Sequence, residues 1–229
     1  MAETYRFVLV GNPNVGKSSL FNALTGLHQH TGNWPGKTVA TAAGTCSIDG
    51  AAVELIDLPG TYSLSARSPE EEVAAEYISF GCADAVIVVC DATALERNLY
   101  LALQVMEITD HVVICVNLMD EAGKRGITVD LPRLSQLLGV RVVGTSARQK
   151  KTLPPLLRAA VAAAQERHRK PVPVRYGEAI EAGLFSIEAR LDELLPGSMP
   201  NHRWIAMQLL TGGDTAIRAL EKKLDYYKG

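Results

Sequence analysis

The stretch Gly11-Asn12-Pro13-Asn14-Val15-Gly16-Lys17-Ser18 decides how this chain must fold. It fits the pattern G-x-x-x-x-G-K-[ST], and it lies between an apolar, β-rich run at 5–10 and a helical pattern that begins at Lys17. Strand, glycine loop and helix in this order form a cradle whose backbone N–H groups attract phosphate oxygens. A plain glycine turn with an exposed lysine would use the same letters, but the flanking strand and helix favour a phosphate loop.

The residues downstream repeat the alternation of short apolar runs and helical patterns. Such alternation predicts an α/β fold, a doubly wound and mostly parallel sheet with helices on both faces. Asp49-Gly50 predicts a tight hairpin, so one edge pair should be antiparallel. The expected strands are 5–10, 39–48, 52–56, 85–90, 112–116 and 140–143, and the expected helices are 17–25, 69–80, 96–108, 131–138 and 153–167.

The composition changes near residue 167. A charged, proline-punctuated link at 168–173 is followed by helical spacing at 178–195 and 201–210, and a last helix is expected from Asp214. We therefore expect two domains, an α/β domain at 1–167 and a small all-helical domain at 168–229. The second is too small to be stable alone, so it should pack on the first.

The composition also argues against several classes of protein. The 229 residues include 25 acidic and 23 basic side chains, for a net charge of −2, without the basic excess typical of nucleic-acid binding. The longest uninterrupted apolar run is six residues, as at 85–90, whereas a membrane-spanning helix needs roughly 20. We expect that the chain as written crosses no membrane and carries no signal peptide.

Neither the cysteines nor the histidines form a metal-binding pattern. His28 and His30 lie on what reads as an exposed loop, with no acidic or cysteine partner nearby in the sequence. The four cysteines lie far apart and contain no C-x-x-C pair, so we expect reduced and mostly buried thiols. They are Cys46, Cys82, Cys90 and Cys115.

Asn117-Leu118-Met119-Asp120, at the end of the expected strand 112–116, indicates which base accompanies the phosphates. The carboxylate of Asp120 can accept hydrogen bonds from the ring N1–H and the exocyclic amine of guanine. Adenine offers no such pair of donors and would leave the carboxylate unpaired. Asn117 is expected to brace the base and the phosphate loop together, and Thr145-Ser146-Ala147 to supply a backbone N–H for the guanine O6.

Asp57-Leu58-Pro59-Gly60 follows the expected strand 52–56 and completes the phosphate end of the site. Lys17 should reach the β- and γ-phosphates, while the hydroxyls of Ser18 and Thr38 ligate Mg²⁺ and Asp57 holds it through water. Gly60 can present its backbone N–H to a γ-phosphate, so loss of that phosphate would free the following segment. Asp57 could otherwise be an ordinary acid in a turn after a strand.

These motifs occur in the order found in Ras-like P-loop GTPases, over residues 5–165. The details resemble bacterial ferrous-iron transporter B (FeoB). The resemblance rests on 11–14, on Gly32-Asn33-Trp34-Pro35-Gly36 before Thr38, on 57–64, on Asp91-Ala92-Thr93 and on 95–101. It implies a GTPase that converts GTP and water to GDP and phosphate. The nucleotide-binding set it implies is 11–18 with Ser19, then Gly36, Thr38, 57–60, 117–120, Ser146, Ala147 and Arg148.

The resemblance also implies a potassium-activated enzyme. Asn14 matches the asparagine that ligates the cation, and the backbone carbonyls of Gly32 and Trp34 would complete the cage. A cation there supplies the charge that an arginine finger brings to other GTPases. The implied catalytic residues are Lys17, Thr38, Gly60 and Asn14. Asn14 could instead be a turn residue that tolerates an unusual backbone conformation, and Trp34 a packing residue.

Two positions depart from related GTPases. Thr61 stands where Ras-like switches carry a glutamine that orients water, and Gln149-Lys150-Lys151 lacks a glycine that related loops often have, which bears on guanine affinity. The implied role is to regulate or drive ferrous-iron uptake through a membrane-spanning part of the same protein, at the cytoplasmic face of the bacterial inner membrane. The helical domain is likened to a dissociation inhibitor, and a homo-oligomer is compatible with a membrane pore.

Two alternatives stay open. A ribosome- or tRNA-associated GTPase would usually carry a basic RNA-binding module, which the near-neutral helical tail does not resemble, so no nucleic-acid partner is expected. The second alternative is a non-catalytic nucleotide switch, in which slow GTP hydrolysis only sets how long a partner stays bound.

Overall fold

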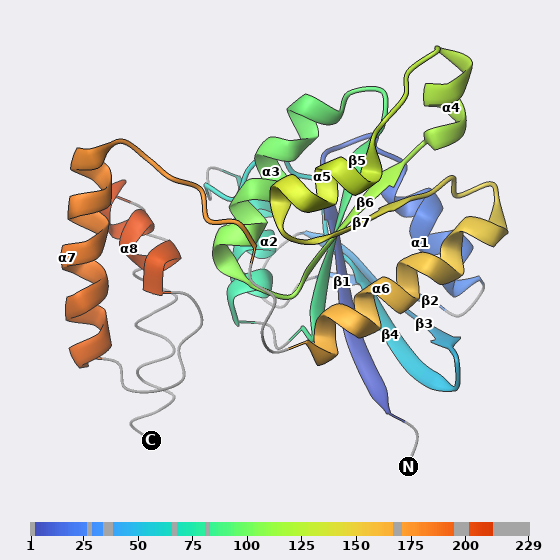
Figure 1. Cartoon of the computed structure of the whole chain (residues 1–229). Helices are drawn as coiled ribbons and strands as arrows, with labels where there is room; N and C mark the ends of the chain where they lie inside the picture. Colours follow the sequence, from blue (N-terminus) through green and yellow to red (C-terminus); the bar gives the residue numbers. More distant parts are fainter. Residues whose placement is uncertain are drawn as a thin grey trace.

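A seven-stranded sheet forms the middle layer of the α/β part, with its strands in the order β2-β3-β4-β1-β5-β6-β7 (Figure 1). The computed structural model describes residues 3–26, 29–33, 39–65, 68–80, 83–166, 171–194 and 202–212. The strands from β4 to β7 pair in parallel, and β2 and β3 add an antiparallel edge. The strands are β1 (Thr4–Gly11), β2 (Gln29–Asn33), β3 (Ala40–Ile48), β4 (Ala51–Asp57), β5 (Ala85–Asp91), β6 (Val112–Asn117) and β7 (Arg141–Gly144).

Helices cover both faces of this sheet, as expected of a doubly wound fold. On β1, Phe7 and Leu9 face α1 and α6, whereas Val8 and Val10 belong to the core beneath α2 and α3. Both sets are apolar because a central parallel strand is buried on both sides. The helices are α1 (Lys17–Thr25), α2 (Pro69–Phe80), α3 (Leu95–Ile108), α4 (Met119–Lys124), α5 (Leu131–Leu138), α6 (Leu153–Gln165), α7 (Glu178–Leu194) and α8 (His202–Leu210), with a 3-10 turn at Lys150–Thr152.

All six expected strands and the hairpin are confirmed. Asp49 and Gly50 both have positive φ, 50° and 85°, as a type I′ turn requires. The sequence interpretation was wrong about β2, because His30 was assigned to an exposed loop and instead lies on a strand paired with β3. This strand carries no apolar run that could have predicted it. His28 lies outside the described residues.

Helix α8 packs against α7 and also against α3. Leu184, Trp204 and Ile205 are buried in the same core cluster as Leu101 and Val105 of α3. The expected contact between the helical tail and the α/β part is therefore confirmed. The domain boundary at residue 167 stays a prediction, and the helix expected from Asp214 lies outside the described residues.

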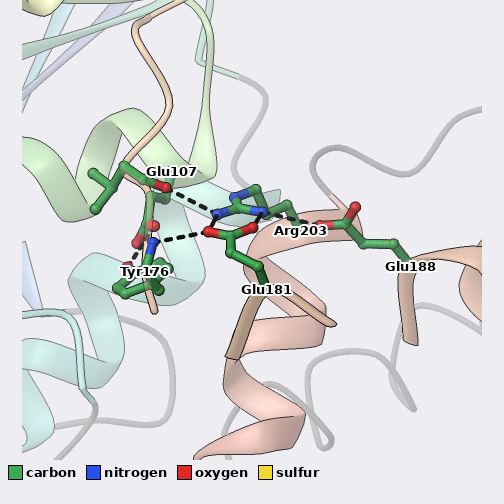
Figure 2. A network of polar contacts seen from close by, with 6 residues as sticks. Glu107, Tyr176, Glu181, Glu188 and Arg203 are labelled. Atoms are coloured by element: carbon green, nitrogen blue, oxygen red, sulfur yellow. Dashed lines mark hydrogen bonds and ion pairs between the residues drawn. The ribbon is translucent and has the colours of Figure 1, made fainter. Parts of the chain in front are cut away.

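Arg203 of α8 is the centre of a polar network where the helical tail meets the α/β part (Figure 2). Its guanidinium holds the Glu181 carboxylate of α7 through two contacts, of 2.8 and 3.1 Å, and donates to the Val174 carbonyl at 2.9 Å. Tyr176, whose ring lies 5.8 Å from the guanidinium, donates its hydroxyl to Glu107 of α3 at 2.6 Å. Burial raises the pKa of Glu107, and the Arg203 contact lowers the pKa of Glu181 to about 2.

The depressed pKa of Glu181 predicts an acid-sensitive contribution to stability. Its stabilisation should be complete above its ordinary pKa of 4.5 and be lost as the pH falls from there toward 2. Glu181→Gln should remove this loss, so that the urea midpoint falls less than in the wild type between about pH 5 and about pH 3. Glu193→Gln, in an exposed pair with Arg190, is the control. An unchanged acid response in Glu181→Gln would contradict the prediction.

No helix within the described ranges is both long and apolar enough to span a membrane. No group of three or more histidine, cysteine, aspartate or glutamate side chains in those ranges could hold a metal ion. Cys46, Cys90 and Cys115 are free thiols, while Cys82 lies outside the described residues.

Candidate nucleotide-binding site

The phosphate loop joins the end of β1 to the start of α1. Its glycines are required by close packing. A Cβ on Gly11 would lie 2.6 Å from the Val89 carbonyl oxygen of β5. A Cβ on Gly16, whose φ is +78°, would lie 2.7 Å from the Asn117 side-chain nitrogen. The loop therefore sits directly on the neighbouring strands, which leaves its outer side to line the site.

A hollow of about 450 Å³ lies over this loop. Gly60 belongs to it because the segment after β4 returns to the loop, where a Cβ on Gly60 would be 3.2 Å from Pro13 Cα. Two backbone hydrogen bonds hold that segment, Leu58 N to Leu9 O and Thr61 N to Gly11 O, both at 3.1 Å. The lining residues, all of them in the expected set, are Asn12, Pro13, Asn14, Gly16, Lys17, Ser18, Ser19 and Gly60.

Lys17 is the central charge of the site. Its ammonium group forms an ion pair with Asp57 and donates to the Leu58 carbonyl, and both side chains are at most 10% exposed. Ser18 Oγ donates to the other Asp57 oxygen at 3.3 Å. The start of α1 and the end of β4 thus place a hydroxyl beside a carboxylate. These are oxygen donors of the kind that Mg²⁺ prefers.

Asn117 braces the other end of the loop. It is fully buried at the end of β6, and its Nδ2 donates to the Val15 carbonyl at 3.0 Å. Its Oδ1 accepts from the Thr145 hydroxyl at 3.1 Å. The expected contact with the phosphate loop is present, while the contact with a base stays a prediction. Sequence reasoning assigned Thr145 only a backbone role and missed this orienting hydroxyl.

Asp120 stands in the first turn of α4, a helix that the sequence interpretation did not predict. Leu118, with a φ of +61°, turns the chain from β6 into α4. The Ser146 hydroxyl accepts from Asp120 N at 3.1 Å, and hydrogen bonding by Ser146 lowers the pKa of Asp120. Asp120 therefore stays a charged acceptor at neutral pH. Ser146 is buried beside it, and its expected backbone role toward the base stays a prediction.

The remaining predicted residues divide into three groups. Ala147 is half-buried next to Ser146, and Arg148 is exposed with an ion-pair contact to Glu121 at 3.9 Å. Gly32 lies on β2, where its carbonyl accepts from Thr41 at 3.5 Å. Trp34, Gly36 and Thr38 lie outside the described residues.

Thr61 is buried, and its hydroxyl donates to the Ser63 carbonyl at 2.7 Å. This local bond occupies the side chain at the position where related switches place a glutamine.

A parallel sheet, a phosphate loop, an aspartate at the end of β4 and an Asn–Asp pair after β6 define a Ras-like G domain of the P-loop class. The sequence profile of the family described as "Ferrous iron transport protein B" matches residues 5–160. The chain belongs to this family.

Individual relatives agree with this assignment. The chain is 42% identical over 212 residues to the Fe(2+) transport protein A/Fe(2+) transporter FeoB fusion protein of Porphyromonas gingivalis, covering 90% of this chain and 25% of that protein. It is 37% identical to the Fe(2+) transporter FeoB of Legionella pneumophila, covering 92% and 28%. The chain thus spans about a quarter of the length of these curated relatives.

The fold also matches a solved structure. The cytosolic domain of the T. maritima FeoB iron transporter in its GDP form superposes with a TM-score of 0.88 at 36% identity, covering 96% of this chain and 86% of that one. The same domain is known in a GMPPNP form.

Proposed function

We propose that this chain binds and hydrolyses GTP, and that it does so as the nucleotide-dependent part of a ferrous-iron transporter at the cytoplasmic face of the membrane. One observation carries the proposal. Asn117 joins the phosphate loop, with Lys17 and Asp57, to the segment that carries Asp120. The residues proposed to bind the phosphates and the residue proposed to bind the base therefore belong to one connected unit. The GDP and GMPPNP forms of the T. maritima relative support the same ligand class.

The chain's own residues supply most of the chemistry. Lys17 and the loop N–H groups hold the phosphates, and water attacks the γ-phosphorus in line as the bond to the β-phosphate oxygen breaks and GDP leaves. Gly60 lies against the loop, where its N–H can contact the γ-phosphate. Ser18 and Asp57 fit Mg²⁺, with Thr38 as the further expected ligand, and the bound ion would neutralise charge that develops on the phosphate oxygens.

The test of the function is nucleotide-selective turnover. The purified chain should release phosphate from GTP and not from ATP when Mg²⁺ is present. Equal turnover of both nucleotides would contradict the role of Asp120, and no turnover together with tight GTP binding would favour a switch without catalysis. Ferrous-iron uptake by the whole protein in vesicles, with and without GTP, tests the transport role. Family membership supports this role over a ribosome-associated one.

Activation by K⁺ is a separate proposal that rests on Asn14. This side chain is exposed at the hollow over the loop, and its positive φ of 66° turns the chain there. A carboxamide oxygen and backbone carbonyls are suitable ligands for a monovalent cation. Thr61 carries no side-chain amide that could orient the attacking water, so positive charge from a bound cation would lower the barrier in its place.

Replacing Asn14 tests this. KCl should stimulate wild-type GTP turnover relative to NaCl at equal ionic strength, by about tenfold or more. Asn14→Ala should abolish the difference while GDP binding persists. Asn22→Ala, an exposed asparagine on α1, should behave as the wild type. If Asn14→Ala kept full stimulation by KCl, the proposed cation site would be wrong, and Asn14 would be a turn residue only.

A further inference from the structure

Asn12 carries a buried acceptor that nothing in the described structure satisfies. The residue is 3% exposed, and its Oδ1 has no hydrogen-bond partner. A buried carbonyl oxygen without a donor destabilises a fold, so such groups are rare and call for an explanation. Asn98 shows the usual arrangement, since it is 4% exposed and its Oδ1 accepts from Asp91 N at 2.6 Å.

Asn12 lies where two hollows meet. One is the hollow over the phosphate loop, which it shares with Lys17 and Gly60. The other, of about 470 Å³, separates α3 from the segment that follows Gly60. Its other lining residues are Tyr62, Ser63, Ser65, Arg97 and Tyr100. Asn12 is thus the residue that borders both the phosphate site and this second hollow.

Arg97 is the cation of the second hollow. Its guanidinium stacks over the Tyr62 ring, 4.6 Å from the centroid. It makes no hydrogen bond or ion pair within the part of the chain that the structure describes. A guanidinium has five N–H donors, and a hydrogen bond from a charged donor is about twice as strong as a neutral one. The hollow therefore holds an unused strong donor and an unused buried acceptor.

Tyr62 links this arrangement to the nucleotide. It follows Gly60 by two residues and lies between two anchors, Thr61 N on Gly11 O and Leu64 N on the Gln104 side chain at 2.8 Å. A shift of Gly60 toward a γ-phosphate that releases Thr61 N from Gly11 O would be passed on to Tyr62, the residue that now covers Arg97.

We propose that Asn12 and Arg97 form a pair of positioning residues that favours the triphosphate-bound state. When the γ-phosphate draws Gly60 in, Tyr62 leaves the guanidinium, and Arg97 donates to Asn12 Oδ1. The new hydrogen bond exists in one state only, which is the condition for shifting an equilibrium. This inference rests on the proposed GTPase function and adds a recognition element outside its motifs.

The first test is stability without added nucleotide. Asn12→Leu replaces the unsatisfied acceptor with an apolar group of similar size, so its urea midpoint should rise above that of the wild type. Asn98→Leu is the matched control, and its midpoint should fall because it leaves Asp91 N without its acceptor. If Asn12→Leu were destabilised as Asn98→Leu is, the acceptor would already be satisfied, and the proposal would be overturned.

The second test is the ratio of the affinities for GMPPNP and GDP. Asn12→Leu and Arg97→Met should each lower this ratio by about tenfold, the worth of one charge-assisted hydrogen bond. Because Arg97 lies outside the phosphate hollow, Arg97→Met should show this change with GDP affinity nearly unchanged. The double variant should show no larger effect than either single variant. Arg97 is exposed, so Arg97→Met should fold even if the buried substitution does not.

The proposed pairing of Asn12 with Arg97 would be overturned by either of two results. One is an unchanged ratio of GMPPNP to GDP affinity in both single variants, and the other is a double variant whose effect is the product of the two single effects. The proposed function would fail in a different way, because the wild-type chain would then not bind the two guanine nucleotides at all.

Discussion

Asp120→Asn is expected to weaken GDP binding by about a thousandfold. In the proposed site the carboxylate would accept two guanine N–H groups, and each charge-assisted hydrogen bond contributes about 1.5–3 kcal/mol. A carboxamide has one acceptor and places an N–H₂ group against a guanine donor. The low pKa of Asp120 means that the wild-type acceptor is charged throughout the neutral range. Titration calorimetry with GDP measures the loss.

Xanthine nucleotides provide the internal control. Xanthine has a carbonyl where guanine has the exocyclic amine, so Asp120→Asn should gain affinity for XDP while it loses affinity for GDP. Glu121→Gln changes the next acid on α4, which pairs with Lys124, and should leave both affinities unchanged. GDP binding within a few-fold of wild type in Asp120→Asn would show that this residue does not read the base.

Lys17→Met is expected to reduce GTP turnover by a factor of about a thousand and also to destabilise the fold. Turnover should fall because the variant lacks the ammonium group that, in the proposed mechanism, stabilises charge on the transferring phosphate. Stability falls because Asp57 is 9% exposed and would keep a buried charge without its partner. Removing one member of a buried pair typically costs about 3–5 kcal/mol in the free energy of unfolding.

The double variant Lys17→Met/Asp57→Asn separates the two effects. It removes both charges, so urea unfolding should recover most of the lost stability, whereas phosphate release should stay at the level of Lys17→Met. If the double variant were as unstable as the single one, the ion pair would not be the cause of the destabilisation. If its turnover recovered, Lys17 would have no direct part in the chemistry.

The sequence alone predicted the elements that carry strong local signals. Short apolar, β-rich runs marked the strands from β1 to β7 except β2, and the spacing in α1, α2 and α5 gave their bounds as the structure has them. The sequence did not predict β2 or α4. The polar β2 is held by pairing with β3, and the six-residue α4 follows a left-handed Leu118 that no propensity favours. Both depend on neighbours that are distant in the chain.

Short motifs predicted three parts of the site: the phosphate loop, Asp57 at the end of its strand, and the spacing of Asn117 and Asp120. They could do so because the backbone geometry of a glycine loop or a strand end is set within a few residues. The tertiary structure had to decide which side chains meet. Asn117 reaches Val15 across 102 residues, and Arg203 ties α8 to Glu181 of α7. Asn12 is left with an unmatched acceptor at the hollow that Arg97 also lines. Such contacts depend on how whole helices and strands pack, and the local sequence does not determine which residues far apart in the chain this packing brings together.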